Sequence, residues 1–203
     1  MRTNRRKMMN SQVDLKVEYI TVTGSQIIKT DWIPLLKTKV SIKVIYHFDP
    51  TDLTPYAIGL FSSQDKDGKS FVITKGGDVT GRFYHLEAYN NYLWPTNQPI
   101  NITVEDSVLY EFTLDSYGLS INGKNVGTHT RTVYNKSSMD IFERKDISSK
   151  TTLNFYGCKC WNNGILERDF VPAKKNGIYG LYDKVNKKFW RSSSGVDFLG
   201  KDK

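Results

Sequence analysis

The feature that most constrains this chain is the strict alternation between residues 39 and 48, in the sequence KVSIKVIYHF. Positions 40, 42, 44 and 46 carry Val, Ile, Val and Tyr, whereas positions 39, 41 and 43 carry Lys, Ser and Lys. Because successive side chains of a β-strand point to opposite faces, this pattern predicts a strand with one buried face and one face in water.

Turn-forming residues separate several further strands that the sequence predicts, at 108–114, 118–126, 153–161, 178–182 and 188–191. Asn122-Gly123 favours a two-residue hairpin, because both residues tolerate the positive φ of a type I′ turn. The best helical candidate, residues 137–142, would form one turn at most. Short strands at this spacing predict an all-β sandwich or barrel, with a single domain over 13–203 and an N-terminal arm over 1–12.

Length and composition agree with a folded β domain. The chain has 203 residues, of which 38% are hydrophobic, so it can bury a core of ordinary size. It contains no apolar run of the roughly 18 residues that a membrane helix needs, so no membrane association is expected. The opening MRTNRRKMMN is basic but has no apolar stretch behind it, so it does not resemble a secretory signal, and we expect synthesis in the cytosol.

Both cysteines lie in one tripeptide, Cys158-Lys159-Cys160. On a strand they would face the same side, where a bridge between them would strain the backbone. No histidine has a spacing that would complete a zinc site with them, since such a site needs about four ligands. We therefore expect two free thiols on a strand.

The formal net charge of +8 is concentrated in two places. The arm carries Arg2, Arg5, Arg6 and Lys7 with no acid among its residues. A second group lies near the end of the chain, at Lys174, Lys175, Lys184, Lys187, Lys188 and Arg191. An arm plus an edge is unlike the continuous basic groove of a nucleic-acid-binding protein, so specific nucleic-acid recognition is not expected.

Three stretches carry a likeness to a known family. Residues 17–34, VEYITVTGSQIIKTDWIP, resemble the opening "VEYIxxTGxQxIxT" of bacterial and phage concanavalin-like (LamG-type) domains, and 119–123, LSING, resemble their central "LYING" hairpin. Residues 166–198 contain RDFVPA, GIYGLYDKVNKKFW and SSSGVDF, which resemble the closing "RDFVPxxxxxxxGLYDxVNxKFYxxxGxGxF". The resemblance implies a two-sheet antiparallel jelly roll whose first and last strands are neighbours. It also implies a place among surface proteins and phage structural proteins.

A hydrolase is the first functional alternative, because the concanavalin-like fold includes glycosidases. A retaining glycosidase needs two carboxyl groups about 5–5.5 Å apart, which one strand can supply as E-x-D-x-x-E. The chain contains no such run: Glu105 and Asp106 are adjacent, and Glu167 and Asp169 look like solvated turn residues. We therefore expect a protein that is not an enzyme.

Two loops are candidate ligand sites. Asp65 and Asp67 resemble the start of a calcium loop, but its later ligands are missing, so a hairpin turn between 60–61 and 71–73 is the favoured interpretation, and no cofactor is expected. The loop over 89–99 combines aromatic faces that stack on sugars with amides that hydrogen-bond to them. Its candidate carbohydrate-binding residues are Tyr89, Asn90, Asn91, Tyr92, Trp94 and Asn97, although a loop that packs its aromatics on the core is the alternative.

The arm is the candidate docking segment. Its arginines pair bidentately with carboxylate or phosphate, and Met8 and Met9 add an adaptable apolar contact. A solvated tail is the alternative interpretation. Together with the resemblance, these residues lead to the hypothesis of a multi-copy virion protein of a bacteriophage (decoration, head-fibre or tail-associated) that docks on other virion proteins through the arm. The alternative is a lectin-like module, at a bacterial surface or outside the cell, that recognises bacterial or gut polysaccharide.

Overall fold

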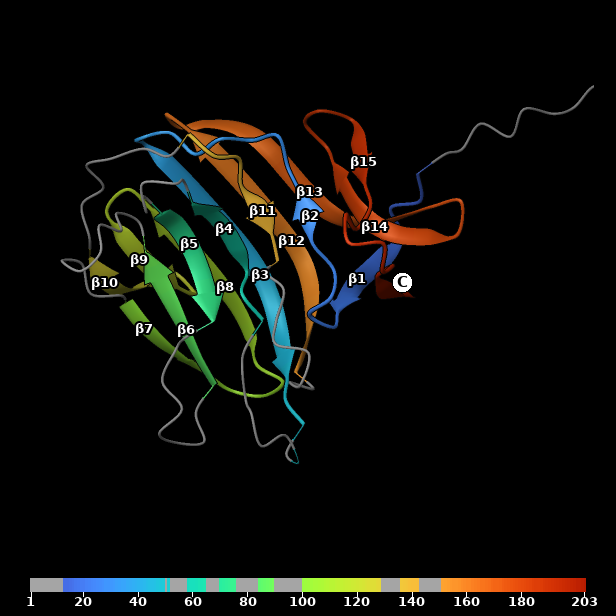
Figure 1. Ribbon diagram of the computed structural model, residues 1–203, viewed down its shortest axis with the longest axis horizontal. Helices are drawn as coiled ribbons and strands as arrows, with labels where there is room; N and C mark the ends of the chain where they lie inside the picture. Colours follow the sequence, from blue (N-terminus) through green and yellow to red (C-terminus); the bar gives the residue numbers. More distant parts are fainter. Residues whose placement is uncertain are drawn as a thin grey trace, which may run out of the picture.

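Two antiparallel sheets make up the fold (Figure 1). The computed structural model describes residues 13–49, 51, 58–64, 70–75, 84–89, 100–128, 136–142 and 151–203. The larger sheet has ten strands, β1 (Val17–Val22), β3 (Thr38–His47), β8 (Leu109–Asp115), β9 (Gly118–Ile121), β10 (Lys124–Thr128), β12 (Thr152–Asn162), β13 (Ile165–Lys175), β14 (Ile178–Asp183), β15 (Lys188–Trp190) and β16 (Leu199–Asp202). The smaller sheet has six, β2 (Ile28–Lys29), β4 (Phe61–Gln64), β5 (Ser70–Lys75), β6 (Tyr84–Tyr89), β7 (Ile100–Val104) and β11 (Asp140–Ile141).

The larger sheet runs in the order β10-β9-β8-β3-β12-β13-β14-β15, and β1 pairs with both β12 and β16. The first and last strands are therefore neighbours, with Ile20 opposite Gly200, as the resemblance implies. All these pairings are antiparallel, so the predicted all-β class is confirmed for the described residues. None of these residues belongs to a helix that could cross a membrane.

The core lies between the two sheets. Alternate residues of β3 from Val40 to Tyr46 are completely buried, as the alternation predicts. Facing side chains of the smaller sheet, such as Phe61 and Ile73, belong to the same apolar cluster, which extends from β1 to Phe198. Each large apolar side chain that leaves water in this way stabilises the fold by about 1.5–3 kcal/mol.

Local turn chemistry accounts for the hairpin between β9 and β10. Asn122 and Gly123 have φ angles of 50° and 78°, the left-handed values that the Asn-Gly pair predicts. Ile121 and Lys124 face each other across the turn. The Asn122 side chain also accepts a hydrogen bond from the Glu111 amide at 2.7 Å, which ties the hairpin to β8.

The helical turn suggested for residues 137–142 is wrong. Asp140 and Ile141 form the short strand β11, which pairs with β2 on one side and β4 on the other. Phe142 then takes a positive φ of 65°. Tertiary pairing decides the conformation here, because the two flanking strands offer the backbone more hydrogen bonds than one isolated helical turn could.

The two cysteines are free and buried on β12, which confirms the expectation of thiols that share one face of a strand. Their Sγ atoms lie 3.9 Å apart. The intervening Lys159 is exposed, so the strand presents its thiols to the core and its ammonium group to water.

Candidate functional site

The segment from Ile178 to Arg191 is named here the closing hairpin, since it contains β14, β15 and the turn between them. Tyr182 lies directly opposite Phe189. Leu181 and Asp183 are buried and define the inner face of the hairpin. By alternation, Tyr182 and Phe189 belong to the opposite, outer face.

A completely buried carboxylate holds the turn of the hairpin together. Asp183 Oδ1 accepts hydrogen bonds from the backbone amides of Val185 at 3.0 Å and Asp169 at 3.2 Å. Its Oδ2 accepts one from Asn186 Nδ2 at 2.7 Å. The Asp-Lys-Val-Asn turn is therefore closed by side chains of its own first and last residues, which is a common use of Asp and Asn in turns.

Arg168 joins this carboxylate to the surface. Its Nε lies 3.6 Å from Asp183 Oδ2, and its Nη2 donates a hydrogen bond to Asp31 Oδ1 at 2.8 Å. This hydrogen bond lowers the pKa of Asp31. Lys188 Nζ lies 3.7 Å from the other oxygen of Asp31 and 3.6 Å from the ring centroid of Trp190. The inner side of the hairpin therefore balances its cations with acids.

Glu167 and Asp169 are not solvated turn residues, and that expectation is corrected here. Both lie on β13. Glu167 Oε2 accepts hydrogen bonds from Trp32 Nε1 at 2.6 Å and Asn162 Nδ2 at 2.8 Å. The carboxylate thus satisfies a buried indole and a buried amide, a structural role that the charged neighbours in the sequence conceal.

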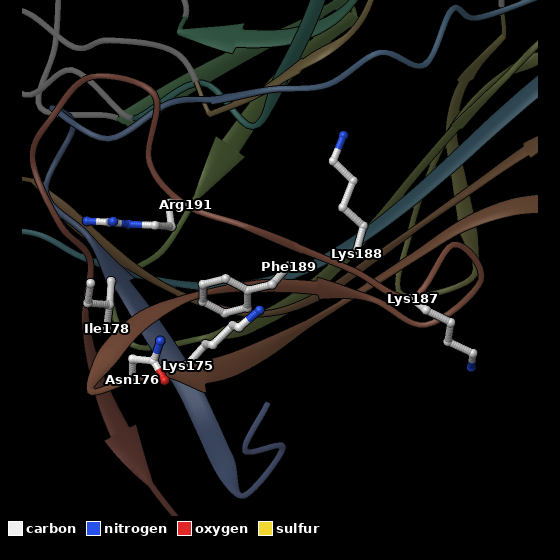
Figure 2. A pocket seen from close by; sticks show the side chains of 7 residues that line it. All are labelled: Lys175, Asn176, Ile178, Lys187, Lys188, Phe189 and Arg191. Carbon is white, nitrogen blue, oxygen red and sulfur yellow. The ribbon is translucent and has the colours of Figure 1, made fainter. Parts of the chain in front are cut away.

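The outer face of the hairpin carries an open hollow of about 500 Å³ (Figure 2). Its lining residues are Lys175, Asn176, Ile178, Lys187, Lys188, Phe189 and Arg191. The half-buried Phe189 ring lies over Gly180: a Cβ placed there would be 2.7 Å from Cζ of the ring and 2.3 Å from the Trp190 carbonyl oxygen. Glycine is therefore needed at position 180 so that the ring can lie flat against the strand.

The lining of the hollow includes four cationic side chains and no acidic one. Figure 2 shows Lys187 and Lys188 pointing away from the Phe189 ring in opposite directions. Within the described chain, no ion pair joins Lys175 or Lys187 to an acid. Arg191 Nη2 lies 3.4 Å from Asp197 Oδ1, and because both side chains are more than half exposed, this pair is weak.

The basic residues near the end of the chain differ in whether an acid lies beside them. Lys174 pairs with Asp202 and Lys184 with Asp169, and Lys188 reaches Asp31. The cations of this edge are evident in the sequence, whereas Phe189, Ile178 and Asn176 are not recognisable there as their neighbours in a hollow. A signal for Phe189 is present in LYDKVNKKFW. Tyr182 and Phe189 flank the turn so that they lie opposite each other, and alternation with Leu181 and Asp183 puts both aromatic residues on the outer face.

Most of the other candidate sites lie outside the described residues. These are the arm residues Arg2, Arg5, Arg6, Lys7, Met8 and Met9, the candidate calcium ligands Asp65 and Asp67, and the loop residues Asn90, Asn91, Tyr92, Trp94 and Asn97. Tyr89 ends β6, and its side chain is likewise not described. The strands flanking Asp65 and Asp67 do pair as predicted, with Phe61 opposite Ile73. Over the described ranges, no three His, Cys, Asp or Glu side chains gather as metal ligands would.

The fold and the hollow define a class: an all-β protein of two facing antiparallel sheets with a cation-lined hollow on its closing hairpin. Comparison with known proteins adds no family to this class, because no family model matches the chain and no curated protein matches it.

Proposed function

We propose that this chain is a non-enzymatic structural protein of a bacteriophage virion, a concanavalin-like jelly roll that docks through its N-terminal arm and is displayed on the particle. The resemblance of residues 166–198 to closing segments of phage and bacterial domains supports the family. The attachment point of the arm supports the docking role most directly.

The arm, residues 1–12, joins the fold at one edge. Asp14 and Lys174 exchange two backbone hydrogen bonds of 2.7 and 2.8 Å, and the Lys203 amide donates to the Lys16 carbonyl at 2.8 Å. The chain following the arm is therefore fastened to β13 and to the end of β16. A partner that grips the arm would hold the domain by this edge, so that the opposite end of the sandwich could face outward.

Charge indicates what kind of partner the arm would need. Two acids beside the attachment edge are already paired, Asp202 with Lys174 at 2.9 Å and Glu18 with Lys201 at 3.0 Å. The four cations of the arm, Arg2, Arg5, Arg6 and Lys7, have no acid among residues 1–12. An acidic protein surface in the virion would supply the carboxylates that arginine pairs bidentately.

The structural use of two carboxylates, Glu111 and Asp106, supports a non-catalytic role. Glu111 pairs with Lys43 at 3.2 Å and accepts a hydrogen bond from Ser41, which lowers its pKa. Asp106 accepts the Phe48 amide at 2.8 Å, and this bond lowers the pKa of Asp106. A general acid needs the opposite shift, toward neutral pH.

Deletion of residues 2–10 tests the proposal in virions. If the arm docks the protein, virions purified from the deletion mutant will lack it while the protein still accumulates folded in the infected cell. A matched control is Lys124→Gln, which removes an exposed cation from the β9–β10 hairpin and should leave the copy number unchanged. Copurification of the deletion mutant at normal stoichiometry would refute docking through the arm.

Polysaccharide recognition is the second candidate function. The aromatic and amide side chains of residues 89–97 remain its sequence-based prediction. The hollow beside Phe189 favours recognition at a different place, on the closing hairpin.

A further inference from the structure

We propose that the hollow on the outer face of the closing hairpin binds an acidic polysaccharide, with one sugar ring stacked on Phe189 and its anionic group held by Lys175 and Arg191. This activity goes beyond docking in a virion and does not depend on it. Three features of the hollow lead to the proposal: its platform, its charge and its limited extent.

The platform is an aromatic ring held in a fixed position. Gly180 leaves room for the Phe189 ring over β14, and Tyr182 lies opposite Phe189 in register. Ile178 adds an apolar side chain to the same hollow, and Asn176 adds an amide. Sugar C–H groups pack on an aromatic face, and an amide matches hydroxyl groups as both donor and acceptor. A ring that is already in place loses little entropy on binding.

The hollow is positively charged because the acids of the closing hairpin lie on its inner side. On the inner side, Asp31 and Asp183 balance Arg168 and Lys188. The lining of the outer hollow contains cations and no carboxylate. Lys188 and Arg191 each have an acid near them, Asp31 and Asp197, but a neutral sugar would leave Lys175 unmatched. A carboxylate or sulfate on the sugar would pair with Lys175 and would strengthen the weak balance of Arg191. The same positive potential would speed the approach of an anionic chain.

The extent of the site favours a polysaccharide over nucleic acid or an acidic protein. The hollow is open to solvent and has a volume of about 500 Å³, so it offers room for one or two sugar rings. Single-stranded nucleic acid binds along a groove that tracks several phosphates. Two other basic residues of this part of the described chain, Lys174 and Lys184, are paired with acids, so they do not extend the cations of the hollow into such a track.

Binding of the full chain to defined polymers tests the proposal. The probes are polygalacturonate, dextran sulfate, uncharged dextran and a single-stranded oligothymidylate, each measured by isothermal titration calorimetry at low salt. We expect polygalacturonate or dextran sulfate to bind, dextran not to bind, and affinity to fall as salt rises. Phe189→Ala should weaken binding about tenfold, and Lys175→Gln or Arg191→Gln about threefold each.

Controls separate the hollow from general charge and from misfolding. Phe189→Tyr keeps an aromatic face and should bind like the wild type, whereas Lys124→Gln removes a distant exposed cation without effect. Neutralising the arm, by Gln at Arg2, Arg5, Arg6 and Lys7, should leave polysaccharide affinity unchanged even if it abolishes docking. Thermal unfolding of each variant verifies that it is folded.

Several results would overturn the proposal. They are no binding to either acidic polymer, equal affinity for the oligothymidylate, unchanged affinity in folded Phe189→Ala, or loss of affinity when only the arm is neutralised. The last result would assign polyanion binding to the arm, and it would leave the docking proposal standing.

Discussion

The guanidinium of Arg168 and the carboxylate of Asp183 lie on the neighbouring strands β13 and β14, with Nε and Oδ2 3.6 Å apart, and the carboxylate is completely buried. Asp183 also accepts hydrogen bonds from the amides of Val185 and Asp169. This arrangement fixes the base of the closing hairpin, whose outer face carries the proposed ligand hollow.

Removal of this carboxylate should destabilise the protein strongly. Asp183→Ala leaves the buried donors around this carboxylate without their acceptor and removes one of the two acids that balance Arg168, so we expect the free energy of unfolding to fall by about 3–5 kcal/mol. Urea denaturation followed by tryptophan fluorescence measures the change. Asp197→Ala, which breaks an exposed pair with Arg191, should cost about 0.5 kcal/mol or less. A loss below about 1 kcal/mol for Asp183→Ala would contradict this account of the hairpin.

Tyr46 should make stability depend on alkaline pH. Its hydroxyl donates to the Ile58 carbonyl at 2.6 Å in a fully buried site, and burial raises the pKa of Tyr46 well above its ordinary value. The protonated phenol is therefore favoured in the folded state. Its contribution is complete below the unfolded pKa of about 10 and is lost as pH rises above it.

Ultraviolet titration of the phenols checks this expectation. Tyr46 should ionise only as the protein unfolds, so its phenolate signal should appear together with the loss of structure. Tyr46→Phe should cost about 1–3 kcal/mol at neutral pH, because the Ile58 carbonyl loses its partner. It should also reduce the alkaline dependence. Ionisation of every tyrosine in one step, with the fold intact, would show that Tyr46 is accessible.

The two thiols should be inert until the protein unfolds. Cys158 and Cys160 are buried, and burial raises the pKa of Cys160, so little of the reactive thiolate forms. Ellman's reagent should label neither thiol at pH 8 in the native state and both in 6 M guanidinium chloride. Rapid stoichiometric labelling of the native protein would place them at the surface instead.

A methyl group at position 180 should disturb both the fold and the hollow. In Gly180→Ala the new Cβ would lie 2.3 Å from the Trp190 carbonyl oxygen, a backbone atom that has little room to move. We expect a loss of about 1–3 kcal/mol in stability. Gly157→Ala is the control, because its Cβ would be 3.4 Å from its nearest neighbour. Equal stability of the two variants would contradict the claim that the Phe189 ring and the Trp190 carbonyl require glycine at position 180.

Local patterns predict the strands but not all of their partners. The alternation along β3 identifies both the strand and its buried face, and Asn122-Gly123 identifies a hairpin, because each signal depends only on adjacent residues. Glu167 could not be interpreted in this way, since the groups that it satisfies come from Trp32 and Asn162. A charged residue between charged neighbours resembles a surface residue until its partners are known.

In the candidate site, too, adjacent residues can be interpreted from the sequence and contacts between distant residues cannot. The sequence shows that cations gather near the end of the chain, but only the pairing of β13, β14 and β15 separates Lys174, which is paired, from Lys175, which lines the hollow. Residues 137–142 illustrate the limit for secondary structure, because pairing with β2 and β4 outweighs a weak helical preference. The arm and the 89–99 loop stay predictions.

The central claim, docking on a virion through the arm, is tested most directly by adding purified protein back to particles that lack it. Copies bound per particle are counted for the wild type and for the variant with Gln at Arg2, Arg5, Arg6 and Lys7, over a range of salt concentrations. We predict saturable binding of the wild type that weakens with salt and little binding of the variant. Equal saturation by both proteins would contradict docking through the arm.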